Sequence, residues 1–299
     1  MKSTQQAQQA IENLNNEVLA LMESAGTDWM KPWSTKLAKG IPHNYFNKRN
    51  YNGINLWLLN WDAQYTSTAW ATKRQWETAG YTEFDGDGTV VILVKKTKSS
   101  KYKDKEGKPI QYWLQRHYVV YNSEQVAGFK LPDDYTTPDQ NHALYGSCKF
   151  ANSIVESSGA DIRHGDTRAY FVPSLDFIGM PDVTDFKSID HYYATLLHEL
   201  THWTGHKDRL DRFKYLDGET DRKQYAFEEL VAEFGSAQLC ALTGADKGKV
   251  RDDHAKYLNN WMKALRDNPK YLPQAIALAN KSTQYLLDIE AEASESQVA

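Results

Sequence analysis

Residues 198 to 202 read His-Glu-Leu-Thr-His, and this pentapeptide constrains the chain more than any other stretch of its sequence. Side chains four positions apart share a face of an α-helix, so His198 and His202 can offer imidazole nitrogens to one tetrahedral zinc ion. Glu199 then lies beside the metal, where it can accept a proton from a bound water that the metal has acidified. The pattern predicts a hydrolytic metal centre with Glu199 as the general base.

The residues around the pentapeptide favour a partly buried helix over a surface helix with two solvated histidines. Ser188 is expected to cap the start of this helix, and Gly205 is expected to stop it. The apolar side chains that recur between them at helical spacing are Tyr193, Leu196, Leu197, Leu200 and Trp203. In this setting a metal site is the preferred interpretation.

A catalytic zinc site needs a third protein ligand and one open position, and the sequence offers three candidates for that ligand. Glu229 lies on a second predicted helix, residues 221–242, and gluzincin-type sites take their carboxylate from a separate helix. Asp208 completes the pattern HExxHxxGxxD, in which a glycine turn can return a carboxylate to the metal. His206 follows His202 by four residues, but a helix curls away from a metal bound by its preceding turn. We favour Glu229 and keep the other two as alternatives.

Further carboxylates are expected to orient the ligands rather than to bind the ion. Glu233, four residues after Glu229, can hydrogen-bond a ligating histidine, and Asp208 is a second candidate for such a supporting role. Glu228 is expected to face elsewhere on the helix. Zinc is the expected ion, and a site of two histidines and a carboxylate with an open position also accepts manganese.

Groups that would contact a substrate are less specific in the sequence. Tyr193 and Tyr225 are candidates for stabilising an oxyanion, and each is also an ordinary core aromatic. A short strand at residues 170–172 could offer an edge that aligns an extended peptide.

Composition and charge divide the chain into two halves. It has 299 residues, of which 41% are apolar and 25% charged, as in a globular protein of one large or two ordinary domains. Residues 1–130 hold 17 Lys and Arg against 12 Asp and Glu, whereas residues 131–299 hold 18 against 27. Only the front half should therefore favour polyanions. Short apolar runs and a polar N-terminus predict a cytoplasmic protein without a membrane span, and its two cysteines are expected to be reduced.

Hydrophobic periodicity and turn residues predict an α+β fold with a mainly helical back half. In the front half we expect helices over 3–25, 53–61 and 70–79, strands over 89–94 and 112–121, and a lysine-rich loop or hairpin arm over 95–108. A linker is expected between about 131 and 147. In the back half we expect helices over 148–157, 221–242, 252–267 and 273–290, a strand over 168–173 and a frayed tail from 291.

Aromatic and basic residues alternate in the front half. This combination suits single-stranded nucleic acid, because planar side chains stack on unpaired bases while Lys and Arg neutralise phosphates. The expected DNA contacts are Trp33, Lys48, Arg49, Tyr51, Lys73, Arg74, Lys96 and Lys98. Against this interpretation, Trp57, Trp61 and Trp76 have the helical spacing of core residues, and a lysine-rich arm is often only a solvated sheet edge.

Longer strings extend over nearly the full chain, among them Pro32-Trp33, Gly40–Asn44, Asn50–Leu59, Tyr118–Gln125, Met180-Pro181, His198–His206 and Glu228–Glu233. In these strings the chain resembles the ArdC-type antirestriction proteins of conjugative plasmids and other mobile elements. The resemblance implies a single-stranded-DNA-binding domain over residues 1–135 and a zincin-like metallopeptidase domain over 145–290, similar in plan to proteases that act on DNA–protein crosslinks. It also implies that the protein shields incoming plasmid DNA from host restriction. The segment 82–89 departs from the family pattern, so that turn is not assigned to phosphate contact.

Two other functions compete with this one. The chain could be a DNA-binding shield whose metal domain cleaves nothing, or a metallopeptidase whose basic half binds an acidic protein partner. Under the leading hypothesis the partners are single-stranded DNA and a DNA-bound protein substrate.

Overall fold

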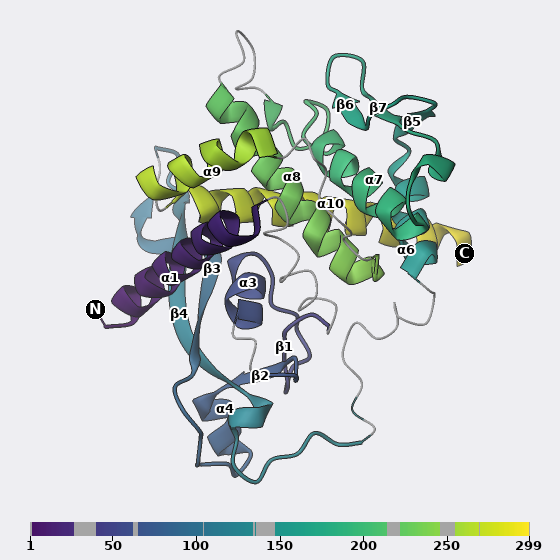
Figure 1. Cartoon of the computed structure of the whole chain (residues 1–299). Coiled ribbons are helices and arrows are strands. Elements are labelled where there is room, and N and C mark those ends of the chain that lie inside the picture. Colours follow the sequence, from purple (N-terminus) through teal and green to yellow (C-terminus); the bar gives the residue numbers. More distant parts are fainter. Residues whose placement is uncertain are drawn as a thin grey trace.

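The computed structural model describes residues 2–26, 40–61, 65–103, 105–133, 135, 147–213, 222–245, 255–268 and 270–298. Trp33 lies outside the described residues, as do the side chains of Trp61 and Lys96. Over the described residues the chain has the expected α+β architecture, with a sheet in the front half and a mainly helical back half (Figure 1).

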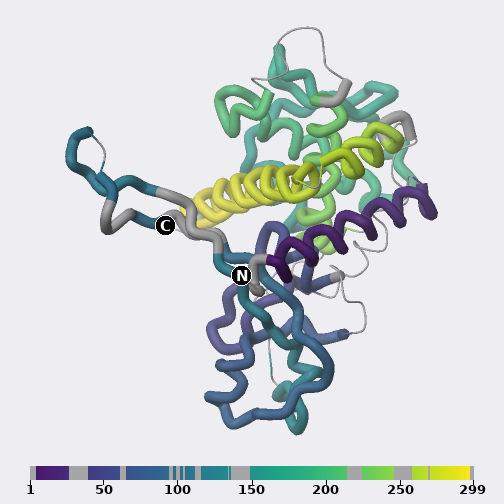
Figure 2. The backbone as a smooth tube through the Cα atoms, turned by 90° about the vertical axis from the view of Figure 1, so that its left-hand side faces the viewer, coloured from purple at the N-terminus to yellow at the C-terminus, as the bar shows by residue number. Residues whose placement is uncertain are grey.

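The front half builds a four-stranded sheet in the order β1-β2-β4-β3. Its strands are β1 (His43–Asn44), β2 (Ala69–Thr72), β3 (Thr89–Lys103) and β4 (Pro109–Asn122). β1 runs parallel to β2, and the other two pairings are antiparallel. β3 and β4 continue as a two-stranded arm that projects from the body of the molecule (Figure 2). The lysine-rich segment therefore belongs mostly to this hairpin.

The helix expected over 70–79 is wrong in its first residues. The structure places β2 at Ala69–Thr72 and a shorter helix, α4, at Lys73–Thr78. The Thr72 hydroxyl accepts a hydrogen bond from the Gln75 backbone N–H, and the Gln75 side-chain oxygen accepts one from the Thr72 backbone N–H. The two bonds form a capping box. Because this box starts the helix at Lys73, the apolar residues before it are free to join the buried centre of the sheet.

The back half consists of long helices and a small sheet that packs against one of them at its edge (Figure 1). The helices are α6 (Ser147–Ser158), α7 (Ile189–Trp203), α8 (Arg222–Thr243), α9 (Ala255–Asp267) and α10 (Tyr271–Val298). The sheet has the order β5-β7-β6, with β5 at Asp161–His164, β6 at Tyr170–Val172 and β7 at Phe177–Met180. The short segments η2 (Ser123–Gln125) and η3 (Val183–Asp185) are 3₁₀ turns.

The expectation of a frayed tail from residue 291 is wrong, because α10 continues to Val298. The segment lacks glycine and proline, and polar pairs support its exposed face. Ser294 donates to Glu290, and Ser296 donates to the Glu292 carbonyl, each across one turn of the helix.

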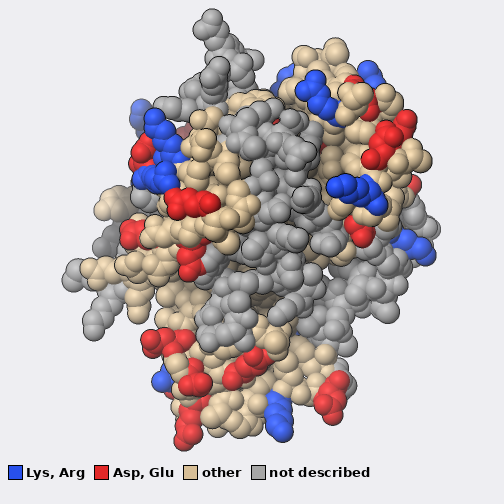
Figure 3. All heavy atoms as spheres, viewed as in Figure 1, with Lys and Arg blue, Asp and Glu red and all other residues tan. Residues whose placement is uncertain are grey.

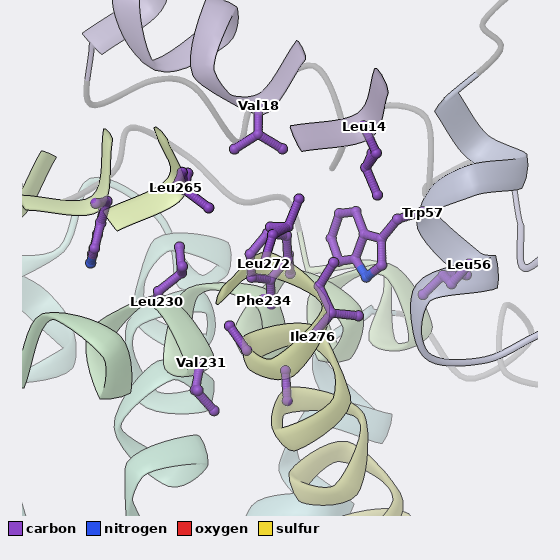
Figure 4. Packing of buried hydrophobic residues seen from close by; sticks show 14 of the residues in the cluster. Leu14, Val18, Leu56, Trp57, Leu230, Val231, Phe234, Leu265, Leu272 and Ile276 are labelled. Atoms are coloured by element: carbon purple, nitrogen blue, oxygen red, sulfur yellow. The ribbon is translucent and has the colours of Figure 1, made fainter. Parts of the chain in front are cut away.

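Helices of both halves share one apolar core. α1 (Lys2–Ala25) and α3 (Ile54–Trp61) of the front half pack against α8, α9 and α10. The side chains labelled in Figure 4 are Leu14, Val18, Leu56, Trp57, Leu230, Val231, Phe234, Leu265, Leu272 and Ile276. The rings of Trp57 and Phe234 meet edge to face with centroids 4.8 Å apart. The back-half helices therefore depend on the front half for part of their apolar burial.

Polar contacts join the halves as well, since Gly53 donates its backbone N–H to Asn280 on α10 and Asn15 donates to the Leu265 carbonyl. A second apolar cluster holds α7 between α6, the small sheet and α8. Within the described part of the chain, none of the helices combines the length and apolar character that crossing a bilayer requires.

Candidate functional site

The HExxH segment lies on α7, which begins where the sequence predicts. The Ser188 hydroxyl accepts a hydrogen bond from the His191 backbone and caps the helix. Most of the helix from Tyr192 onward is buried, and the apolar side chains on it pack in the second cluster. This packing fixes the rotation of α7 and turns His198 and His202 to one side, with their ring centroids 4.9 Å apart.

Glu229 on α8 faces both histidines. Its Oε2 lies 3.6 Å from Nε2 of His198, and its Oε1 lies 3.6 Å from Nε2 of His202. Two ligand atoms at roughly 2.1 Å from a tetrahedral ion would be about 3.4 Å apart, so these spacings suit a shared cation better than direct hydrogen bonds. Among the described residues these three side chains form a group whose ligand atoms all lie within 4.8 Å of one another.

The other nitrogen of each imidazole faces a second carboxylate. Glu233 Oε1 lies 3.4 Å from Nδ1 of His198. Glu228 Oε1 accepts from Nδ1 of His202 at 3.3 Å. A carboxylate at Nδ1 holds the proton there and leaves the Nε2 lone pair for an ion. Both histidines are therefore oriented to present Nε2 to the space beside Glu229.

The expectation that Glu228 faces elsewhere is wrong. Consecutive helical residues diverge by about 100°, but the two nitrogens of one imidazole also point in different directions. His202 lies between Glu228 and Glu229 and contacts one with each nitrogen. Arg212, which the sequence gave no reason to select, reaches both oxygens of Glu228.

The electrostatics of the group follow from its burial and its crowding of charges. Burial disfavours charge on His202, but Glu229 and Glu228 outweigh it and raise the pKa of His202 to about 10. Burial lowers the pKa of His198. Burial of Glu229 acts to raise its pKa, but the neighbouring histidines His202 and His198 outweigh this effect and hold the pKa of the carboxyl well below its usual range. A buried carboxylate that needs two imidazoles for compensation is also suited to a divalent cation.

The structure does not bring the two alternative third ligands to this group. α7 ends at Trp203, and the chain turns away after it. The Asp208 side chain is 66% exposed and pairs with Lys207. His206 Nδ1 lies 3.5 Å from Asp208 and 3.9 Å from Asp176. Neither His206 nor Asp208 is among the converging side chains, and Asp208 contacts His206 rather than a member of the group.

The remaining residues selected around the centre occupy different environments. Glu199 is buried on α7 next to His198, with 2% of its surface exposed. The Tyr193 hydroxyl donates to Asn152, so that ring is a buried packing residue. Tyr225 is 42% exposed and lies one helical turn before Glu229 on α8. β6 is an edge strand of the small sheet and packs against α7.

In the front half, a tight turn after β1 presents Lys48 and Arg49 to solvent. Asn44 organises this turn, because its side-chain oxygen accepts from the Phe46 and Asn47 backbones. Lys48 has a left-handed backbone with φ of 59°, and its ammonium lies 3.6 Å from the centroid of the Tyr135 ring. Both basic side chains are exposed beside a Phe46 ring that is 40% exposed.

The same turn is fixed to the start of α4, which carries Lys73 and Arg74. The Asn44 amide donates to Gln75, and the ring of Tyr45 stacks on Trp76 at 5.3 Å with an interplanar angle of 22°. The four basic residues are all exposed. These contacts thus join the turn that carries Lys48 and Arg49 to the helix that carries Lys73 and Arg74.

Two other residues predicted to contact DNA lie outside this turn and the start of α4. Tyr51 is partly buried and packs against an apolar cluster that includes Leu59 and Trp70, and burial raises the pKa of its hydroxyl. Lys98 is exposed on β3 within the arm. On the face shown in Figure 3, basic and acidic side chains of the described residues are interspersed and form no continuous basic patch.

Comparison with known families matches both halves of the chain. Residues 8–126 match the family described as the N-terminal domain of anti-restriction factor ArdC. Residues 149–278 match a family described as zincin-like metallopeptidase. The second match includes every residue of the converging group.

Solved structures with the same fold include the antirestriction protein ArdC from plasmid R388. Its metal-free structure has a TM-score of 0.74 and 34% identity, over 94% of this chain and 98% of that one. Its Mn(II)-bound structure has a TM-score of 0.72 at the same identity and coverage.

Similar sequences occur both as whole proteins and as parts of larger ones. An uncharacterized protein of Sinorhizobium fredii is 30% identical over 96% of this chain and 94% of its own length. A DNA primase TraC of Escherichia coli is 33% identical over 96% of this chain, which spans only 28% of that primase.

Proposed function

Because this chain belongs to the ArdC family of antirestriction proteins, we propose that it binds single-stranded DNA and carries a metal-dependent peptidase centre. Acting together, the two activities would protect incoming plasmid DNA from host restriction in the cytoplasm. The observation that carries the proposal is the convergence of Glu229 with Nε2 of both HExxH histidines, each with a carboxylate behind it.

In this proposal His198, His202 and Glu229 hold the cation. When bound, the ion would polarise a scissile carbonyl and acidify a water molecule. Zinc suits the two-histidine, one-carboxylate set, and the Mn(II)-bound R388 structure supports manganese as an alternative. Glu233 and Glu228 keep the two imidazoles in the tautomer that frees Nε2.

Glu199 is the proposed general base and acid. It accepts a proton from the attacking water and returns one to the leaving amine. Its burial beside His198 keeps the carboxylate in a water-poor environment. The edge strand β6, next to α7, would align an extended segment of a DNA-bound protein substrate.

The proposed DNA surface centres on the turn after β1 and the start of α4. Lys48, Arg49, Lys73 and Arg74 would neutralise phosphates, and the exposed Phe46 ring would stack on a base. Lys98 on the projecting arm lies away from this turn and would be a separate phosphate contact. The contacts predicted for Trp33 and Lys96 lie outside the described residues.

One substitution separates a peptidase from a shield that cleaves nothing. Glu199→Gln should keep the bound metal and the affinity for an oligonucleotide, because it removes neither a ligand nor a basic side chain. It should abolish cleavage of an unfolded protein such as casein, assayed with single-stranded DNA present. If the variant still protects DNA from an endonuclease as well as the parent chain, cleavage plays no part in protection.

A salt series tests the DNA surface. The variant Lys48→Ala/Arg49→Ala should bind a labelled oligonucleotide more weakly, and its dependence of log affinity on log salt should become shallower by about 1.4, for two phosphate contacts. The matched control Lys149→Ala/Lys187→Ala removes two exposed lysines of the back half and should leave the slope unchanged. A flat salt response of the parent chain would favour a protein partner for the basic half.

A further inference from the structure

Arg212 is a buried guanidinium next to the metal centre. Its side chain is 4% exposed, although arginine is rarely buried without full compensation. Its Nε and Nη2 donate to the two oxygens of Glu228, at 3.1 and 2.7 Å. Nη2 also donates to the Thr201 carbonyl, and Nη1 donates to the hydroxyls of Thr204 and Ser282. These contacts occupy all five N–H donors of the side chain.

The contacts connect Arg212 to His202 through Glu228, on the side of the imidazole that faces away from Glu229. Arg212 holds Glu228, Glu228 accepts from Nδ1 of His202, and Nε2 of His202 faces Glu229. The fork of the guanidinium fixes both oxygens of Glu228 in one plane, which a single point charge cannot do. Glu228 is therefore held with one oxygen aimed at the imidazole.

We propose that Arg212 is a positioning residue of the metal centre, which acts on His202 through Glu228 and touches neither the ion nor its ligands. The proposal rests on the metal centre proposed above. By fixing Glu228, Arg212 selects the His202 tautomer with a proton on Nδ1 and sets the direction in which Nε2 points. Its bonds to Thr201 and Ser282 also join the end of α7 to α10, so the ligand is aligned with the helices that enclose it.

Local sequence supports this placement. A Cβ built on Gly205 would lie 2.9 Å from Nη2 of Arg212 and 2.7 Å from the ring of Phe213. Gly205 does not have a positive φ, so this position needs glycine for space and not for a left-handed backbone. The glycine that follows the HExxH helix thus makes room for the guanidinium.

A matched control lies three residues away. Arg209 is also buried, with 9% of its side chain exposed, and it also forms a bidentate pair, with Asp176. It donates to the Trp203 carbonyl and stacks on the Trp203 ring at 3.7 Å. The partners of Arg209 are Asp176 and Trp203, so it shares the burial and packing of Arg212 without its place behind His202.

The experiment measures affinity for Zn²⁺ by chelator competition, together with the visible absorption of the Co²⁺-loaded full chain. Arg212→Met and Glu228→Gln should each weaken metal binding about 10- to 100-fold and change the Co²⁺ spectrum. The double variant should be no weaker than the worse single variant, because both changes break one connection. Arg212→Lys should recover only part of the affinity, and Arg209→Met should change it less than about threefold.

Each contrary result has a defined meaning. Unchanged affinity and spectrum in Arg212→Met would overturn the positioning role while leaving the metal centre intact. An equal loss in Arg209→Met would assign the effect to general destabilisation, and additive losses in the double variant would show that Arg212 does not act through Glu228. If Arg212→Met does not fold, Arg212→Lys and Glu228→Gln decide, and full affinity in both overturns the proposal. A parent chain that binds none of Zn²⁺, Co²⁺ or Mn²⁺ would overturn the metal centre itself.

Discussion

The close approach of α7 and α8 sets the geometry of the proposed metal centre, and Gly235 allows this approach. A Cβ built on Gly235 would lie 2.5 Å from Cγ2 and 3.0 Å from Oγ1 of Thr201 on α7. Thr201 lies between the two ligand histidines in sequence, and Glu229 and Glu233 precede Gly235 on α8. Carbon atoms in contact prefer about 3.5 Å, so Gly235→Ala must separate the helices locally by about 1 Å.

Two opposing terms set the change in the free energy of unfolding that Gly235→Ala causes. Alanine in a helix interior is more favourable than glycine by about 1 kcal/mol, whereas overpacking costs about 1–3 kcal/mol. Gly235→Ala should therefore destabilise the protein by at most about 2 kcal/mol, and the fold should survive. Metal sites tolerate about 0.2 Å in ligand distance, so a shift of about 1 Å should weaken metal binding at least tenfold.

The assay combines urea unfolding with chelator competition for Zn²⁺ on purified full chain, and it includes a suppressor. Thr201→Ala removes Cγ2 and Oγ1 and leaves its Cβ at 3.4 Å from the new methyl, an ordinary contact. The double variant Gly235→Ala/Thr201→Ala should thus recover most of the metal affinity, while Thr201→Ala alone should change it little. The reasoning fails if Gly235→Ala binds metal as tightly as the parent chain, or if the suppressor restores nothing.

The remaining predictions concern the ligands and one ion pair. Elemental analysis should show that Glu229→Ala loses the bound metal and that Asp208→Ala retains it, and the reverse result would reassign the third ligand. Hydrogen bonds from Arg209 lower the pKa of Asp176, so the pair stabilises the fold above the ordinary carboxyl pKa and loses this contribution as the pH falls through the lowered value. Asp176→Asn should therefore flatten the decrease of Tm on acidification below about pH 4, and an unchanged acid profile would show that the pair does not contribute.

Local signals in the sequence were sufficient for much of the fold. Ser188 predicts the start of α7, and the spacing of the apolar residues in α7 predicts which side of the helix is buried. The spacing of Glu229 and Glu233 likewise identifies a helix face with two acids. Signals of this kind act within one helix, where geometry depends only on residue number.

Features that depend on contacts between elements could not be found in this way. Whether Glu228 points to a histidine depends on how α8 crosses α7, which no periodicity within α8 encodes. Arg212 lies in an irregular segment, and its partners are 8 to 70 residues away in sequence. Trp70 has the spacing of a helical residue, yet it belongs to a strand because β4 is present to pair with it.

α8 contributes both to the proposed metal centre and to the apolar core that the two halves share, although the sequence places the whole helix in the back-half domain. Glu228, Glu229 and Glu233 face α7, while Leu230 and Phe234 of the same helix pack in the core shared with α1 and α3. A helix buried on both sides cannot move toward one neighbour without moving away from the other. The position of the carboxylates therefore depends on front-half side chains such as Trp57, even though these touch no ligand. For this reason the proposed metal centre and the front half are best regarded as one packed unit, and isolating the zincin-like segment would remove part of the support of its proposed third ligand.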